Sequence, residues 1–198
     1  MYTIIEDCSP YYIRFTHDDL DKIIDICKQG MDGVDLQDTF AHYKFPPEIR
    51  QEILSTTPLS QSLDLNKNRA SMFVTKGGRY YRAHKDGVYT RISLNYTVEI
   101  LDDTCVTNWY SDEDVIGYEL VGAAWENPSR EAKGFDKSKH TPVKSMVAQP
   151  NECILFNTDI WHDFDNSKST NRRMVLTLRV NDVENFYFND AKKALFGL

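Results

Sequence analysis

Near its C-terminal end the chain reads Arg173-Met174-Val175-Leu176-Thr177-Leu178-Arg179, an alternation that predicts a β-strand with two different faces. One face carries Arg173, Val175, Thr177 and Arg179, and the other carries the methionine and the two leucines. The row of methionine and leucine has to be buried, and we expect it to lie under helices. The opposite face, with two guanidinium groups and a hydroxyl, then lines the interior of a barrel.

The chain upstream of this strand divides into a part with helical periodicity and a longer part with strand-like segments. Leu20, Ile23, Ile24 and Cys27 follow the i, i+3, i+4, i+7 rule of an amphipathic helix, which Gly30 ends. A second helix is predicted from Pro46-Pro47 to Leu54. A short strand is predicted before the first helix, over residues 11–15. After the second helix, short strands are predicted over residues 71–75, 79–83, 91–101, 104–110, 119–125, 145–148, 152–156 and 173–180.

Helices followed by about eight strands without intervening helices predict a mainly β (α+β) fold. The natural candidate is an antiparallel double-stranded β-helix, or jelly-roll barrel, backed by N-terminal helices. We expect a single domain over residues 1–198. Within it, residues 1–69 form a helical support, residues 70–182 the β-helix core, and residues 183–198 a C-terminal tail with a short helix around 191–195.

Composition excludes several functional classes. A formal net charge of −7 makes nucleic-acid binding unlikely, because that affinity depends on lysine and arginine. No segment approaches the roughly 20 apolar residues that cross a bilayer, and residues 1–15 lack the pattern of a signal peptide. The four cysteines, Cys8, Cys27, Cys105 and Cys153, show no paired spacing. These features predict a cytoplasmic protein with free thiols and no membrane association.

A candidate metal site follows the Gly77-Gly78 turn. His84-Lys85-Asp86 stands at the end of a predicted strand, and His162 follows 78 residues later. Two imidazoles and one carboxylate can occupy one face of an octahedral metal and leave the other positions open, which is the ligand set of non-haem iron(II) oxygenases. A second His-x-Asp, in His17-Asp18-Asp19, falls at a predicted helix start and is expected to be structural, as are His42 and His140.

The barrel face of residues 173–179 adds a candidate anion site. Buried arginines need anionic partners, and a dicarboxylate that also chelates the metal would satisfy Arg173 and Arg179 together. On this strand phase the neighbouring Arg172 points to solvent. A register slip of one residue would exchange the two, so Arg172 remains the alternative to Arg173.

These residues resemble the 2-oxoglutarate/Fe(II)-dependent oxygenase superfamily over about residues 71–180. Residues 77–86, with Tyr81 three before His84, look like the approach strand of prolyl 4-hydroxylases. Residues 156–162 are similar to the aspartyl/asparaginyl β-hydroxylase segment, in which a phenylalanine precedes the distal histidine by six. The spacing of Arg173 and Arg179 resembles that in the final strand of nucleic-acid demethylases of the same superfamily.

The resemblance implies an enzyme with Fe(II) and 2-oxoglutarate. His84, Asp86 and His162 would bind the metal. Arg173 would hold the distal carboxylate of the co-substrate, and the residues expected to assist it are Arg179, Thr177, Tyr81 and Asn95. The implied reaction releases succinate and CO2 and hydroxylates an amino-acid, peptidyl or small-molecule substrate. We expect that substrate at the barrel mouth near Trp109 and Tyr110, under the polar segment 126–142, which is either a lid or a plain surface loop.

Three further possibilities stay open. The acidic segment 111–114 would favour a cationic substrate. A cupin-type isomerase or sugar-binding module could use the same barrel, although cupins usually carry His-x-His with a following glutamate where this chain has Asp86. In a non-catalytic structural jelly-roll, His84 and His162 would lie far apart. The sequence does not indicate an oligomeric state.

Overall fold

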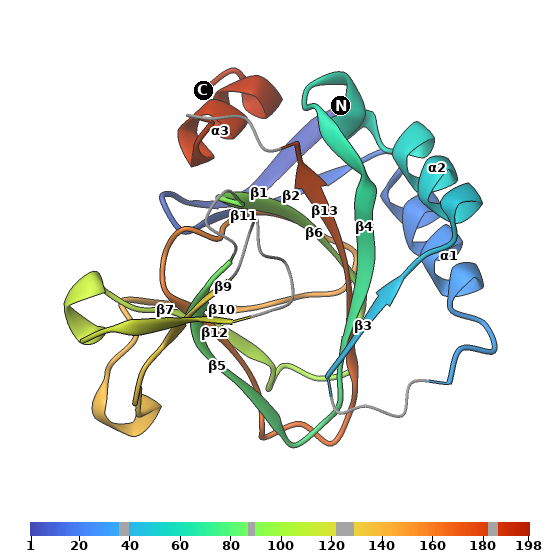
Figure 1. Ribbon diagram of the computed structural model, residues 1–198. Helices are drawn as coiled ribbons and strands as arrows, with labels where there is room; N and C mark the ends of the chain where they lie inside the picture. Colours follow the sequence, from blue (N-terminus) through green and yellow to red (C-terminus); the bar gives the residue numbers. More distant parts are fainter. Residues whose placement is uncertain (36–39, 87–89, 122–128, 182–185) are drawn as a thin grey trace.

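Two antiparallel sheets face each other in this protein. The computed structural model describes residues 1–35, 40–86, 90–121, 129–181 and 186–198, and thirteen strands are found among them. The larger sheet has the order β1-β2-β11-β6-β13-β4-β3 and the smaller one β10-β7-β12-β5-β9-β8. The two sheets form separate layers of the molecule (Figure 1). Residues from both sheets line a cavity between them. This arrangement is the double-stranded β-helix that the sequence predicts.

The larger sheet contains the predicted two-faced strand, which lies between β6 and β4. Its seven strands are β1 (Tyr2–Cys8), β2 (Tyr12–His17), β11 (Cys153–Asn157), β6 (Ile92–Glu99), β13 (Arg173–Val180), β4 (Leu65–Thr75) and β3 (Phe40–Lys44). The smaller sheet holds β10 (Lys144–Val147), β7 (Val106–Trp109), β12 (His162–Asn166), β5 (Arg79–Lys85), β9 (Ser129–Ala132) and β8 (Tyr118–Val121).

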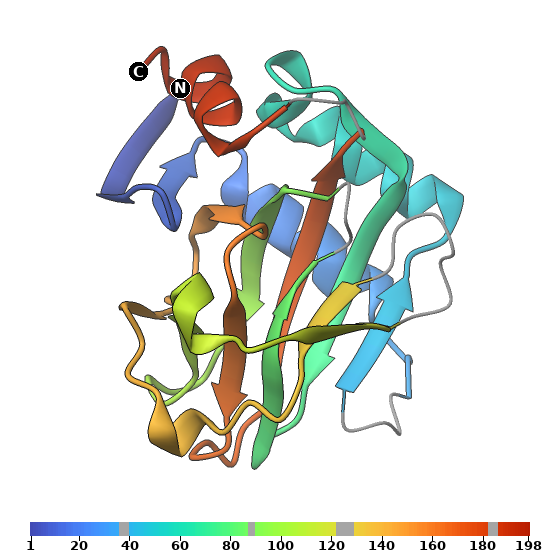
Figure 2. The same ribbon diagram turned by 60° about the vertical axis from the view of Figure 1, so that its left-hand side comes forward.

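Helices cover the outer face of the larger sheet (Figures 1 and 2). They are α1 (Leu20–Gly30), α2 (Pro47–Thr56) and α3 (Phe188–Phe196), and the short 3-10 helix η1 (Pro58–Gln61) follows α2. Two further 3-10 helices, η2 (Asp112–Asp114) and η3 (Lys137–Lys139), follow β7 and β9 of the smaller sheet. Met174, Leu176 and Leu178 of β13 are buried in one cluster with Ile23 and Ile24 of α1. The predicted burial of this face under helices is therefore confirmed. No helix in the described ranges combines the length and hydropathy that a membrane span requires.

The N-terminal segment 1–69 is more than the helical support that the sequence suggests. It supplies β1, β2, β3 and the first part of β4 to the larger sheet. Strand β2 pairs with β11, and its Tyr12, Ile13 and Phe15 are buried. The predicted strand over residues 11–15 is confirmed as β2, and the predicted strand over residues 71–75 is the last part of β4. The sequence does not predict β1, β3 and the first part of β4, because their residues do not alternate clearly between apolar and polar.

The predicted loop 126–142 is also partly a strand. Residues 122–128 lie outside the described ranges, but β9 follows directly and pairs with both β5 and β8. Strand β9 escapes prediction because it is polar. Its Arg130 binds Asp159 at 2.8 Å, and its Glu131 binds Arg82 at 2.7 Å. Because each charge has an opposite charge beside it, the cost of placing these residues in a strand is offset.

The Gly77-Gly78 turn sets the position of β5. Gly78 has a φ of +75°, a conformation that favours glycine. A Cβ atom on Gly77 would lie 2.5 Å from the backbone carbonyl carbon of Thr170, so the turn packs directly against that segment. The close approach fixes where β5 starts and therefore where its last residues emerge beside β12.

Candidate metal centre

The two histidines of the motif meet on neighbouring strands. His84 near the end of β5 pairs in register with His162 at the start of β12, and their ring centroids are 4.3 Å apart. Asp86 follows β5 by one residue, and its Oδ1 lies 3.4 Å from Nε2 of His84. One ligand atom from each of these three residues lies within 4.8 Å of the others. The structure thus brings together all three side chains that the sequence singles out.

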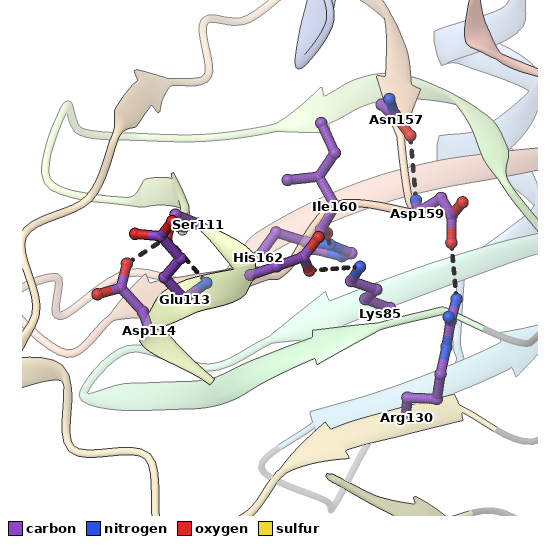
Figure 3. Close-up of polar contacts among 10 residues, drawn as sticks. Lys85, Ser111, Glu113, Asp114, Arg130, Asn157, Asp159, Ile160 and His162 are labelled. Carbon is purple, nitrogen blue, oxygen red and sulfur yellow. Dashed lines mark hydrogen bonds and ion pairs between the residues drawn. The ribbon is translucent and has the colours of Figure 1, made fainter. Parts of the chain in front are cut away.

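Backbone carbonyls orient both imidazoles. Nδ1 of His84 lies 2.9 Å from the Arg82 carbonyl. Nδ1 of His162 lies 2.8 Å from the Ile160 carbonyl, and Figure 3 shows this contact. A carbonyl oxygen only accepts, so Nδ1 carries the proton in each ring and donates it. Each Nε2 then keeps its lone pair, and hydrogen bonds of this kind are typical of histidines that ligate a metal.

The electrostatics of the cluster suit a divalent cation. Burial opposes ionisation of Asp86, but Nη2 of Arg179 at 2.6 Å and the two imidazoles outweigh it, so the pKa of Asp86 is lowered. Burial, with His84 close by, lowers the pKa of His162 to about 3. At neutral pH the cluster therefore offers one carboxylate and a neutral His162, which are the protonation states that metal ligation needs.

The triad opens into a cavity of about 410 Å³ between the sheets. Arg173, Val175, Thr177 and Arg179 all line it, which confirms the predicted strand phase. Arg172 points away instead, is 57% exposed, and binds Glu99 at 2.6 Å.

Two guanidinium nitrogens in this cavity have no hydrogen-bond partner among the described residues. Arg173 is 5% exposed and lies over the ring of Phe164, at 5.1 Å from the ring centroid, but its Nε is buried without a hydrogen bond to any described residue. Nη1 of Arg179 is in the same situation, although Nη2 holds Asp86. Buried donors of this kind are costly unless an acceptor reaches them, so an anion in the cavity would fit both.

The other predicted assisting residues also line the cavity. Thr177 donates from Oγ1 to Oδ1 of Asn95 at 2.9 Å, across the pair β13–β6. Tyr81 stands edge-on to His84, with centroids 4.6 Å apart. Burial, together with Glu131 and Asp86, raises the pKa of Tyr81 to about 12, so its hydroxyl keeps a proton to donate.

Contacts behind the triad brace the loop that leads into β12. Arg130 of β9 binds Asp159 at 2.8 Å, and the Asp159 backbone N–H donates to Asn157 (Figure 3). Asp163, which follows His162, turns to the other face and accepts from Asn108 at 2.8 Å and Tyr110 at 2.7 Å. Sequence reasoning missed these positioning residues, because a single charged or amide side chain without fixed spacing carries no motif.

Several predicted neighbours of the site lie elsewhere. Trp109 is fully buried against Tyr12 and Phe156, and Tyr110 packs in a separate cluster, so neither lines the cavity. Trp109 is the last residue of β7 and packs on Tyr12 and Phe156, and Tyr110 follows it and packs on Phe135. Of the described part of segment 126–142, only Ser129 reaches the cavity, and β9 is held in the sheet, so a lid is not seen there.

Of the three remaining histidines, two have structural contacts, as predicted, and one lines the cavity, which was not predicted. His17 is buried and its Nε2 lies 3.0 Å from the Tyr96 hydroxyl, while His140 binds Asp114 at 3.1 Å and stacks on Phe135. Both are structural, as expected. His42, predicted to be uninvolved, lies on β3 and lines the cavity.

Comparisons with known proteins find the same fold in enzymes of low sequence identity. No family model matches the chain, and no curated protein sequence matches it. Among solved structures, the non-haem α-ketoglutarate-dependent carbocyclase SnoK from nogalamycin biosynthesis is 11% identical with a TM-score of 0.52, over 85% of this chain and 79% of SnoK. HygX from Streptomyces hygroscopicus with nickel and 2-oxoglutarate bound is 7% identical with a TM-score of 0.54, over 89% of this chain and 84% of HygX. At such identities the likeness concerns the fold alone.

Proposed function

We propose that this protein is an Fe(II)- and 2-oxoglutarate-dependent oxygenase that hydroxylates a small-molecule or peptidyl substrate. The observation that carries the proposal is one cavity with two kinds of groups on its walls. His84, Asp86 and His162 converge within 4.8 Å on one wall, and Arg173 and Arg179 each present an unpartnered buried nitrogen on another. A metal-chelating dicarboxylate is the ligand class that would satisfy both at once.

Each residue has a role in this account. His84, Asp86 and His162 hold the ferrous ion through Nε2, a carboxylate oxygen and Nε2. When bound, iron and 2-oxoglutarate supply the oxidising power, in which oxygen is consumed and 2-oxoglutarate is converted to succinate and CO2. Arg173 binds the distal carboxylate of the co-substrate, and Arg179 keeps Asp86 ionised and oriented. Tyr81, Asn95 and Thr177 supply further hydrogen-bonding groups on the same walls.

Apolar rings support this chemistry by limiting water near the triad. Phe156 lies 4.9 Å from His162 and Phe164 lies 5.7 Å from it, measured between ring centroids. A drier site strengthens the attraction between the metal, its carboxylate ligand and the arginines.

The alternatives receive less support from the site. A structural jelly-roll requires His84 and His162 to lie apart, whereas their rings are 4.3 Å from each other. A sugar-binding module gives no reason for two cavity guanidiniums with unpartnered nitrogens. No observation favours a cupin-type isomerase over the oxygenase.

We expect succinate to form only when Fe(II), 2-oxoglutarate and oxygen are all present. The test is to load the purified protein anaerobically with Fe(II) and 2-oxoglutarate, admit air, and measure succinate with and without a panel of candidate substrates. Protein loaded with Zn(II) is the matched control, because zinc fills a histidine-carboxylate site without redox chemistry. An absence of both succinate formation and metal-dependent 2-oxoglutarate binding would contradict the proposal.

A further inference from the structure

Asp86 lies just outside the strands that hold the two histidines. His84 of β5 and His162 of β12 pair in register, so the smaller sheet fixes the distance between them. Strand β5 ends at Lys85, and the pairing of the described strands does not include Asp86. Its backbone N–H donates instead to the carbonyl of Thr158 at 3.2 Å. The position of the only carboxylate in the triad therefore depends on a residue from another segment.

Thr158 is itself held by two further hydrogen bonds. It directly follows β11 and is 1% exposed. Its backbone N–H donates to the carbonyl of Arg91 at 3.0 Å, and its Oγ1 donates to the carbonyl of Thr90 at 2.8 Å. Asp86 precedes, and Thr90 and Arg91 follow, residues 87–89, which lie outside the described ranges. One threonine is thus bonded to the chain on both sides of that segment.

The same threonine lies close to the second histidine along the chain. Residues 159–161 separate Thr158 from His162. Within this short segment the Ile160 carbonyl accepts a hydrogen bond from Nδ1 of His162 at 2.8 Å (Figure 3). Thr158 therefore connects the segments that carry two of the three candidate ligands, Asp86 and His162.

The carboxylate of Asp86 has partners on both sheets. Nη2 of Arg179, on the larger sheet, binds its Oδ2 at 2.6 Å, while its Oδ1 lies 3.4 Å from Nε2 of His84 on the smaller sheet. The ion pair attracts the carboxylate toward Arg179. The hydrogen bond from the Asp86 backbone to Thr158 opposes a shift away from the histidines, because the Thr158 carbonyl belongs to a residue that is anchored at two other atoms.

The hydroxyl of Thr158 can be removed with little change of shape, because valine replaces it with a methyl group. Thr90 is 7% exposed, so its carbonyl would then lose a donor in a place where water has little access. A buried acceptor without a donor is costly, and the surrounding backbone is expected to move to relieve it. Such a movement at Thr158 would reach Asp86 through the 3.2 Å hydrogen bond.

We propose that Thr158 is a positioning residue of the metal centre. Its hydroxyl holds Thr158 on Thr90, and its carbonyl holds Asp86 where one ion can bind the carboxylate together with both imidazoles. The inference rests on the proposed function, because it takes the triad to be a metal site. It depends neither on the co-substrate nor on the reaction. Residues that orient metal ligands typically contribute about 10- to 100-fold to metal affinity.

The test measures the affinity for Mn(II), from the electron paramagnetic resonance signal of the free ion, without 2-oxoglutarate or oxygen. Thr158→Val should weaken Mn(II) binding about tenfold or more. It should also change the visible absorption spectrum of bound Co(II), which depends on the geometry of the ligands. Thr158→Ser keeps the hydroxyl and should bind Mn(II) within about threefold of wild type.

Thr57→Val is the matched control. Thr57 is also 1% exposed, and its Oγ1 lies 2.7 Å from the Tyr96 hydroxyl, but it caps η1 and does not line the cavity. This variant should lower the thermal unfolding midpoint, as Thr158→Val does, and leave Mn(II) affinity within about twofold of wild type. The comparison separates the loss of any buried hydrogen bond from the loss of this one.

A measurement on the unaltered protein decides the matter if Thr158→Val does not fold. The amide hydrogen of Asp86 should exchange with deuterium at least about 100-fold more slowly than in an unstructured peptide, although Asp86 lies beyond the end of β5. Metal-free protein is used, so that protection comes from the bond to Thr158 and not from a bound ion.

The outcomes separate this inference from the proposed function. If wild-type protein binds Mn(II), the inference alone is overturned by unchanged affinity in Thr158→Val or by an equal loss in Thr57→Val. A Thr158→Ser variant as weak as Thr158→Val, or an Asp86 amide that exchanges freely, would also overturn it. If wild-type protein bound neither Mn(II) nor Co(II), the proposed function would fail and this inference with it.

Discussion

Replacement of Asp86 by alanine is expected to reduce iron-dependent succinate formation from 2-oxoglutarate to below about one hundredth of the wild-type rate. Asp86 is the only anionic ligand of the three and lies 3.4 Å from Nε2 of His84. Removing it also leaves Arg179 without its 2.6 Å partner, so a positive charge would face the metal position unopposed. Loss of a residue that merely orients a ligand typically costs 10- to 100-fold, and loss of the ligand should cost more.

The control for this variant is Asp25→Ala, which removes a carboxylate from an exposed position of α1. It should keep wild-type activity. Asp86→Asn provides a second test with nearly unchanged shape, so a loss of activity there cannot come from a cavity. Circular dichroism should report a folded protein in all three. Unchanged succinate release by Asp86→Ala would refute the ligand assignment.

The second large effect concerns Arg173. Arg173→Ala should weaken 2-oxoglutarate binding about 100-fold, which is close to 2.7 kcal/mol and within the range of charge-assisted hydrogen bonds to a buried guanidinium. The side chain is 5% exposed and its Nε has no hydrogen-bond partner among the described residues, so a carboxylate in the cavity would supply the missing acceptor. Titration calorimetry of metal-loaded protein measures the change.

Arg172→Ala is the matched control, because it removes the adjacent arginine from the opposite face of the same strand. Its guanidinium binds Glu99 in solvent, and its loss should leave 2-oxoglutarate affinity within about twofold of wild type. If Arg172→Ala weakened binding more than Arg173→Ala, the anion site would not be where this account puts it.

The sequence alone predicts which faces of strand 173–179 are buried and which three residues form the candidate metal site. In residues 173–179, Met174, Leu176 and Leu178 alternate with a second set that includes two arginines and a threonine, and burial of the apolar set decides which face of the strand lies under the helices. The same period puts Arg173 in the cavity and Arg172 outside it. His84 and Asp86 lie two positions apart at a strand end, so their proximity follows from strand geometry. Their meeting with His162 follows only from the pairing of β5 with β12, which a single sequence does not specify.

The residues that β3 and β4 contribute to the cavity lining could not be predicted from the sequence. His42 and Lys44 lie on a five-residue strand, too short to show an alternation. Arg69 lies in the part of β4 that precedes its apolar run, where the sequence reads as polar. Strand β9 is not recognised in the sequence for a related reason, because its charged residues form ion pairs with residues of distant segments. Pairings of this kind depend on tertiary contacts and leave no local pattern.

The central claim is that one metal ion is held by His84, Asp86 and His162 with 2-oxoglutarate beside it. The most direct measurement is the anomalous difference density of a crystal grown anaerobically with Mn(II) and 2-oxoglutarate. We predict a single strong peak at bonding distance from Nε2 of both histidines and from the Asp86 carboxylate, with the far carboxylate of 2-oxoglutarate on Arg173. A peak on other ligands, or no peak in this cavity, would contradict the claim.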